Sequence, residues 1–126
     1  MAQPVQSFQV DSLPVHVYAT QSEMSEAVAG QVQKILIDAL ARQGSAAVIL
    51  ATGNSQIQFL ARLIALGRVD WSKVTLFHMD EYLGISGDHK ASFRRYMRER
   101  VESLVKPKVF HYLEGDAEQP LDEIAR

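Results

Sequence analysis

The chain has 126 residues, of which 47% are hydrophobic and 22% charged, and its formal net charge is −2. These values are typical of one folded domain, and they exclude a disordered tail and the basic excess that nucleic-acid binding requires. Cysteine is absent, which excludes disulfides, thiolate metal sites and cysteine nucleophiles and fits a reducing cytoplasm. The sequence has no apolar run long enough to span a membrane and no charged leader at Met1–Pro4. We therefore expect a cytoplasmic protein with neither a membrane nor a nucleic acid as its partner.

The first elements are a strand and a long helix. Val15–Ala19 alternates in polarity and is rich in strand-forming residues, and residues 8–10 could pair with it as a short edge strand. Thr20 followed by Glu23 forms the pattern of a capping box, in which each side chain bonds the backbone of the other. The amphipathic helix predicted after it ends at Gly44, a residue suited to a left-handed terminator.

A second strand, a turn and a second helix follow. Ala46–Leu50 is a continuous apolar run, which predicts a central parallel strand covered on both faces. The turn Thr52-Gly53-Asn54-Ser55 leads into an amphipathic helix over 56–66, which Gly67 ends. A strand, a glycine turn and a helix start form the geometry in which backbone N–H groups and the helix dipole receive a phosphate. A single glycine in such a turn also occurs for conformational reasons alone.

The third apolar run delivers two adjacent acids where it stops. Val74–Phe77 reads as a buried strand, and Asp80 and Glu81 follow it. An unpaired carboxylate inside a strand would be costly, whereas at a strand's carboxyl end it faces the crevice where α/β proteins bind ligands. The alternative is a solvated loop. A metal site made of His78, Asp80 and Glu81 is disfavoured, because adjacent strand residues point to opposite faces.

The rest of the chain continues the alternation of helix and strand. A helix is predicted over 92–104, with Arg94, Arg95, Arg98 and Arg100 on a solvated, salt-bridged face. A short strand over Val109–Leu113 and a helix from Pro120 complete the order. This order predicts one α/β domain over residues 1–126, a Rossmann-like three-layer α/β/α fold with a mainly parallel sheet. Both turns then lie beyond the carboxyl ends of neighbouring strands.

With these two turns in place, the sequence resembles the glucosamine-6-phosphate deaminase (isomerase) family, in the wider group that includes 6-phosphogluconolactonases. Thr52–Gln56 corresponds to the family's Thr-Gly-Gly-Thr-Pro turn, and Met79-Asp80-Glu81-Tyr82 matches its signature intact. A downstream pattern is matched by His89, Ser92, Phe93 and Met97. The lactonase branch usually has arginine at the position of Tyr82, so the resemblance favours the deaminase branch.

The resemblance implies conversion of glucosamine 6-phosphate to fructose 6-phosphate and ammonia. In that reading Asp80 is the base that moves a proton between C2 and C1, Glu81 helps to position it, and Tyr82 is a wall or hydrogen-bond partner. The 6-phosphate rests on the N–H groups of Gly53, Asn54 and Ser55 in the turn that Thr52 opens. No cofactor and no metal are expected. The alternatives are a 6-phosphogluconolactonase-type hydrolase and a non-catalytic sugar-phosphate-binding module.

One part of the family pattern is missing. The family's later loop, Gly-x-Gly-x-Asp-Gly-His followed by Ala-Phe-Asn-Glu-Pro, assists ring opening and has no counterpart in this sequence. The chain thus resembles the N-terminal half of such an enzyme, a truncated form expected to be weak or inactive alone. We also expect an exposed apolar surface, with marginal stability or association into a homo-oligomer.

Overall fold

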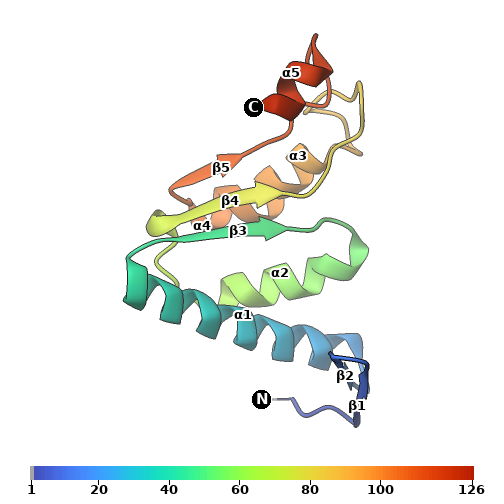
Figure 1. Cartoon of the computed structure of the whole chain (residues 1–126), viewed down its shortest axis with the longest axis vertical. Helices are drawn as coiled ribbons and strands as arrows, with labels where there is room; N and C mark the ends of the chain where they lie inside the picture. Colours follow the sequence, from blue (N-terminus) through green and yellow to red (C-terminus); the bar gives the residue numbers. More distant parts are fainter. Residues whose placement is uncertain (1) are drawn as a thin grey trace.

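A three-stranded parallel sheet organises the protein, and the computed structural model describes residues 2–126. The strands β3 (Ala46–Leu50), β4 (Val74–His78) and β5 (Val109–His111) lie side by side in that order. Each pairs in parallel with the next (Figure 1). The predicted α/β class with a parallel sheet is therefore confirmed.

Helices connect the strands. The longer ones are α1 (Gln21–Gln43), which precedes β3, and α2 (Asn54–Leu66), which joins β3 to β4. Between β4 and β5 the chain forms α3 (Phe93–Met97), η2 (Arg98–Glu102) and α4 (Ser103–Val105). A short turn, η1 (Trp71–Lys73), leads into β4, and α5 (Pro120–Ala125) follows β5. Within residues 2–126, none of the helices combines the length and the apolar character that crossing a membrane requires.

The N-terminal residues form a hairpin that is separate from the main sheet. Strands β1 (Gln6–Val10) and β2 (Leu13–Val17) pair in an antiparallel manner, with Phe8 opposite Val15. The predicted strand over 15–19 thus ends earlier, because the following residues turn into the cap of α1. Thr20 and Glu23 form the expected capping box, and Gly44 ends α1 with φ 75°.

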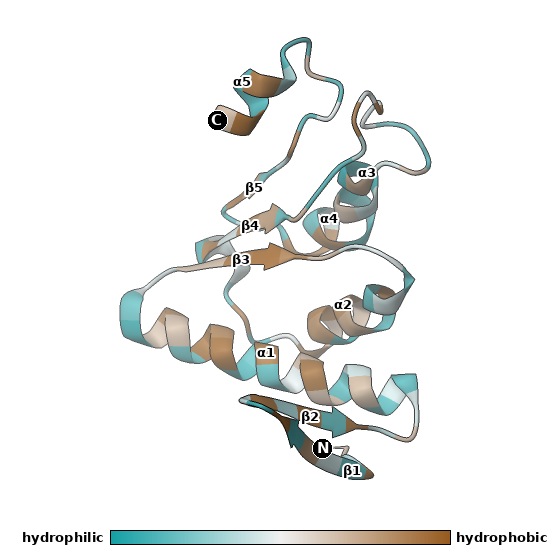
Figure 2. Ribbon diagram, turned by 45° about the vertical axis from the view of Figure 1, so that its right-hand side comes forward, coloured by the Kyte–Doolittle hydropathy of each residue, from teal (hydrophilic) through white to brown (hydrophobic). Residues whose placement is uncertain are grey.

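The helices between the strands cover one face of the sheet. Both crossovers advance in the same direction across the sheet, and because such crossovers are right-handed, both land on the same side. The core on this side contains Leu60 of α2, Met97 of α3 and the sheet residues Leu50 and Leu76. Figure 2 shows the hydrophobic surface of α2 next to the sheet and α1 packed beyond it.

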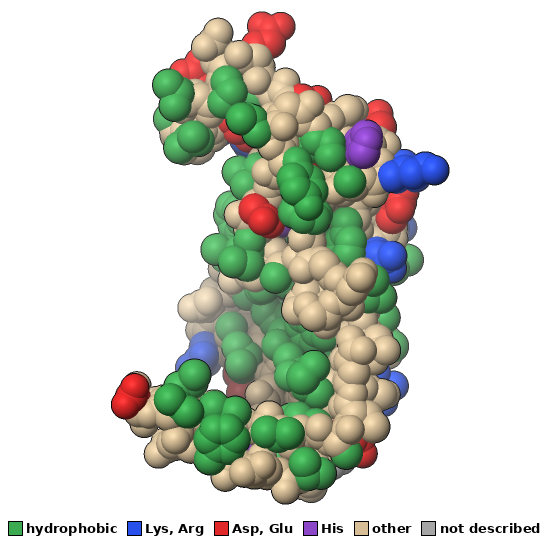
Figure 3. Space-filling model, turned by 90° about the vertical axis from the view of Figure 1, so that its right-hand side faces the viewer, with side chains coloured by type: hydrophobic (Ala, Val, Ile, Leu, Met, Phe, Trp, Pro, Cys, Tyr) green, Lys and Arg blue, Asp and Glu red, His purple; other side chains and the backbone are tan. Residues whose placement is uncertain are grey.

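The opposite face of the sheet is open, which corrects one expectation. Ala46–Leu50 was predicted to be covered on both faces, yet Ile49 is 67% exposed and Phe77 is 37% exposed. The second helical layer of a three-layer arrangement is not formed by residues 2–126, since the crossovers place their helices on the other side. Figure 3 looks onto the carboxyl ends of the strands and shows hydrophobic side chains along the hollowed side of the molecule. The expected exposed apolar surface is therefore present.

The predicted helix over 92–104 is interrupted by a widened turn. Residues Arg98–Glu102 form a π-helical segment between α3 and α4. A π turn contains an extra residue, so the buried stripe shifts by one position after it. In a regular helix the apolar spacing from Met97 and Val101 would bury Leu104, yet Leu104 is 62% exposed and Val105 packs against the core in its place.

The two faces of the sheet should differ in their contribution to stability. Leu76→Ala removes a fully buried side chain and should lower the free energy of unfolding by about 2–5 kcal/mol. Ile49→Ala, on the open face, should cost less than about 1 kcal/mol. Urea denaturation followed by circular dichroism measures both. Equal losses would mean that the Ile49 face is covered in solution, contrary to the described fold.

Candidate active site

The turns after β3 and β4 leave the same edge of the sheet next to each other. Leu50, the last residue of β3, lies opposite His78, the last residue of β4. The segments that follow, Ala51–Ser55 and Met79–Tyr82, therefore start side by side. The prediction that both turns lie at one edge is confirmed, and this edge is the place where open α/β sheets bind ligands.

The first turn presents the start of α2 without a side-chain cap. Gly53 is the N-cap residue, and its φ of 107° and ψ of 170° belong to a region that only glycine adopts readily. Its carbonyl accepts hydrogen bonds from the Gln56 N–H (3.1 Å) and from the Tyr96 hydroxyl (2.9 Å). Thr52 is half-buried before the turn, and Asn54 and Ser55 are exposed in the first turn of the helix. The helix dipole and the first backbone N–H groups thus face solvent at this edge.

In the second turn the two acids have different environments. Asp80 is exposed, and among residues 2–126 no hydrogen bond or ion pair to its carboxylate is present. Glu81 is directed inward, with a side chain only 1% exposed. One turn therefore offers one free carboxylate and one buried carboxylate.

The Glu81 carboxylate is saturated with hydrogen-bond donors. Its Oε1 accepts from the backbone N–H groups of Tyr82 and Phe93, each at 3.0 Å. Its Oε2 accepts from the Ser92 hydroxyl at 2.7 Å and from the backbone and side chain of Arg94, each at 3.1 Å. Glu81 therefore satisfies donors at the start of α3, where Ser92 is also the N-cap.

This environment holds Glu81 in its charged form. Burial by itself raises the pKa of the carboxyl, but the hydrogen bonds from Ser92, Phe93, Arg94 and Tyr82 outweigh it and lower the pKa to about 2. A carboxylate with so low a pKa, and with its oxygens occupied, is unsuited to proton transfer near neutral pH.

Arg94 corrects a prediction. It was expected on a solvated helix face with the neighbouring arginines, yet the residue is only 9% exposed and its side chain pairs with Glu81. The reason is that the buried carboxylate needs a cation, and the first turn of α3 brings Arg94 to it. By contrast, the expected surface pairing holds for Arg95, which bonds Glu99 one turn further along.

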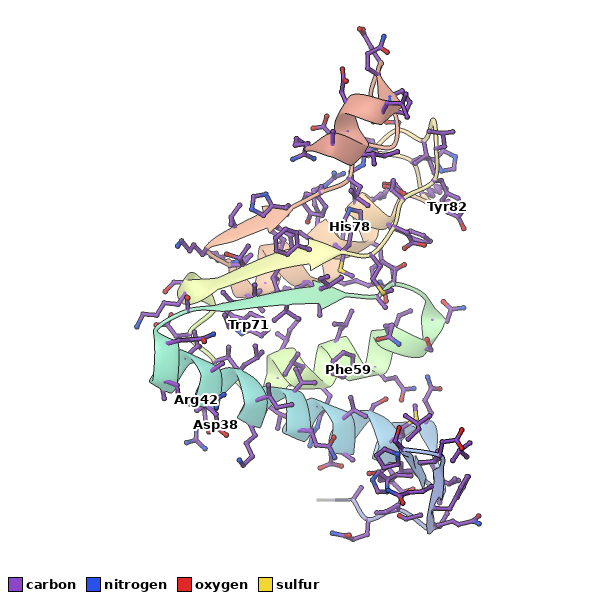
Figure 4. All side chains as sticks on the ribbon, viewed as in Figure 1. Asp38, Arg42, Phe59, Trp71, His78 and Tyr82 are labelled. Atoms are coloured by element: carbon purple, nitrogen blue, oxygen red, sulfur yellow. The ribbon has the colours of Figure 1, made fainter. Side chains whose placement is uncertain are left out.

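His78 ends β4 (Figure 4) and is buried. Its Nε2 accepts a hydrogen bond from the backbone N–H of Leu113 at 2.8 Å, so the neutral ring carries its proton on Nδ1. Burial lowers the pKa of His78, although the Glu81 and Asp80 carboxylates oppose this. His78 Nε2 and the Glu81 oxygens are engaged in hydrogen bonds. His78, Asp80 and Glu81 therefore do not form a set of metal ligands. Among the described residues, no group of three or more His, Asp or Glu is placed to hold a metal.

Tyr82 lies at the outer side of the site. Tyr82 is 53% exposed (Figure 4). Its ring lies 4.9 Å from that of Phe93, centroid to centroid. Its backbone N–H binds Glu81, so its position depends on that carboxylate.

The sequence did not indicate that some of these residues belong to the site. Arg94 looked like one of several surface arginines, and Tyr96, whose hydroxyl holds the Gly53 turn, looked like a core residue of its helix. Asp116, which pairs with Arg94 at 2.8 Å, lies in a segment with no motif. The one available clue was Glu81 itself, since a carboxylate at the end of an apolar strand requires partners.

Comparisons with known proteins agree with this geometry. Residues 19–126 match the family model described as glucosamine-6-phosphate isomerases/6-phosphogluconolactonase. A glucosamine-6-phosphate deaminase of Shewanella loihica is 34% identical over 92 residues, which is 69% of this chain and 34% of that protein. The chain spans about a third of the length of the curated relatives it matches.

Solved structures show the same fold. A monomeric glucosamine-6-phosphate deaminase superposes with a TM-score of 0.73 at 26% identity, over 85% of this chain and 45% of that one. A 6-phosphogluconolactonase of Shewanella baltica gives a TM-score of 0.71 at 22% identity, over 82% of this chain and 43% of that one. The second likeness shows the fold alone.

The low pKa of Glu81 predicts a loss of stability in acid. Its folded pKa of about 2 lies below the ordinary 4.5, so the charged form contributes stability that is complete above pH 4.5 and is lost as the pH falls toward 2. That contribution is on the order of 3 kcal/mol. In Glu81→Gln, the free energy of unfolding should be lower at pH 7 and should depend less on pH between 4.5 and 2. Asp38→Asn, which breaks an exposed ion pair, is the control and should lower the free energy of unfolding at pH 7 by less than about 1 kcal/mol. Equal pH profiles for the wild type and Glu81→Gln would contradict the assignment.

Proposed function

Because the chain belongs to the family of glucosamine-6-phosphate isomerases and 6-phosphogluconolactonases, we propose that the edge formed by the β3 and β4 turns is the sugar-phosphate site of a glucosamine-6-phosphate deaminase-type enzyme. The observation that carries this proposal is the pairing of a free carboxylate, Asp80, with an uncapped helix N-terminus on the neighbouring strand. The Asp80 carboxylate can take a proton from the reacting carbon, and the N-terminus of α2 can bind an anion.

The phosphate binds at the start of α2. The backbone N–H groups of Gly53, Asn54 and Ser55 and the Ser55 hydroxyl are the donors, and the helix dipole adds a favourable field. Gly53 is required because its backbone conformation is strained for any other residue. The bond from Tyr96 to the Gly53 carbonyl holds this turn in place.

The proton transfer belongs to Asp80. In the open-chain amino sugar, its carboxylate removes the proton from C2 to give an enediol-like intermediate and then delivers that proton to C1. This transfer, with one proton lost from the amine and one gained by O1, gives an imine at C2. Addition of water to that imine releases ammonia and leaves fructose 6-phosphate. Glu81 takes no part in the transfer, because its oxygens are occupied and its pKa is about 2. Tyr82 forms a wall of the site.

The partner, the location and the choice between an amino sugar and a lactone are part of the same proposal. The proposed partner is a small phosphorylated sugar rather than a nucleic acid or a membrane. A cytoplasmic location fits the absence of cysteine. Tyr82, at the place of the arginine that the lactonase branch uses, favours an amino-sugar substrate over a lactone.

The phosphate site can be tested by nuclear magnetic resonance. Glucosamine 6-phosphate should shift the amide signals of Gly53, Asn54 and Ser55, and glucosamine without phosphate should not. Gly53→Ala should weaken binding by ~5–150-fold, because a side chain at φ 107° strains the turn by about 1–3 kcal/mol. Ser55→Ala should weaken it about fivefold, since it removes one hydroxyl worth about 1 kcal/mol. Unchanged amide signals at saturating sugar phosphate would refute the site.

The role of Asp80 is tested by exchange of the substrate's C2 hydrogen with deuterium from the solvent. Asp80→Asn should bind glucosamine 6-phosphate with nearly wild-type affinity and should slow the exchange by at least ~10², the scale of losing a general base. Asp88→Asn is the control, since it removes an exposed carboxylate from the loop that follows. Exchange at the wild-type rate in Asp80→Asn would place the base elsewhere. The exchange is compared in a chain that also carries the ring-opening loop, because this chain is expected to be weak or inactive alone. Binding without any exchange in that longer chain would favour a sugar-phosphate-binding module instead.

A further inference from the structure

Three separate segments meet at the Arg94 guanidinium. Its Nε donates to Glu81 Oε2 at 3.1 Å, and one terminal nitrogen donates to the Ile85 carbonyl at 2.7 Å and to Asp116 Oδ1 at 2.8 Å. The side chain is only 10% exposed. Arg94 therefore links the end of β4, the loop after it and the segment after β5.

The segment after β5 contacts the β4 turn directly. The Gly84 N–H donates to the Gly115 carbonyl at 2.6 Å, and a side chain at Gly115 would come within 2.2 Å of the Tyr82 carbonyl oxygen. The Leu113 N–H binds His78 from the same segment. The turn that carries Asp80 thus contacts both the start of α3 and residues 113–116.

The position of Asp80 depends on its neighbours in this arrangement. Among the described residues the Asp80 carboxylate has no hydrogen-bond donor. The side chains of His78 and Glu81, on either side of Asp80 in the sequence, are both held by hydrogen bonds. His78 is tied to Leu113, and Glu81 is tied to Arg94. Whatever holds these two residues determines where the Asp80 carboxylate points.

We propose that Arg94 is a positioning residue, which fixes the Asp80 turn by joining Glu81, the Ile85 carbonyl and Asp116. The importance of this geometry for proton transfer rests on the proposed function of Asp80. Arginine is required because its planar fork donates in several fixed directions, whereas a lysine ammonium is a single point of charge. Displacement of Asp80 should lower the rate of proton transfer. It should leave the affinity for the phosphate unchanged, since the phosphate turn follows another strand.

The test compares Arg94→Lys with the matched control Arg95→Lys, whose partner Glu99 is on the surface. Arg94→Lys should increase hydrogen exchange of the Tyr82 and Gly84 amides, which are bonded to Glu81 and Gly115, by at least ~10-fold, as local opening becomes easier. It should slow exchange of the C2 hydrogen of glucosamine 6-phosphate by ~10–100-fold, the cost of a displacement near 1 Å. Its affinity for that sugar phosphate should stay within about twofold of the wild type. This is the behaviour of a variant that loses an interaction made only in the transition state. Arg95→Lys should match the wild type in all three measurements.

A second variant keeps the test decisive if Arg94→Lys does not fold. Asp116→Ala leaves the pair of Glu81 and Arg94 intact and removes only the outer contact of the guanidinium. It should raise amide exchange at Tyr82 and Gly84 with unchanged far-ultraviolet circular dichroism. Wild-type amide exchange in both variants would overturn the positioning role. A wild type that neither binds glucosamine 6-phosphate nor exchanges its C2 hydrogen would overturn the proposed function alone, since the amide measurement needs no ligand.

Discussion

The site depends on one buried charge, the carboxylate of Glu81. A carboxylate removed from water costs several kcal/mol unless donors replace its hydration, and Glu81 meets this condition with backbone N–H groups, a hydroxyl and a guanidinium. Those donors come from the start of α3, so the carboxylate fixes where that helix begins. They also bring Arg94 inside, and Arg94 in turn holds Asp116. The loop, the helix and the segment after β5 are therefore arranged around a single side chain.

Two adjacent carboxylates acquire different properties from their surroundings. Glu81 points into the protein, where its donors lower its pKa to about 2 and hold it charged. Asp80 is exposed and follows β4 at the sheet edge from which the Gly53 turn also leaves. The separation of roles between neighbouring acids by environment is a common device in enzymes that transfer protons. In this protein the end of β4 directs Glu81 inward and leaves Asp80 exposed.

The sequence predicts the local features better than the arrangement of the layers. The capping box at Thr20, the terminator at Gly44 and the turn at Gly53 depend on residues close in the chain, and each occurs where its pattern predicts. The burial of Arg94 depends on an acid thirteen positions earlier and on Asp116, so no local pattern reveals it. The π turn at Arg98–Glu102 likewise shifts the buried stripe from Leu104 to Val105 without a local signal. The open face at Ile49 follows from the direction of the crossovers, which an apolar run does not encode.

The central claim is that one edge of the sheet holds a sugar phosphate with its reacting carbon at Asp80. A crystal structure with glucosamine 6-phosphate bound tests this most directly. The account predicts the phosphate on the backbone N–H groups of Gly53, Asn54 and Ser55, with C2 of the sugar about 3–3.5 Å from a carboxylate oxygen of Asp80. Glu81 should keep its bonds to Ser92 and Arg94 in that complex. A phosphate bound away from the Gly53 turn, or a sugar whose C2 faces away from Asp80, would contradict the account.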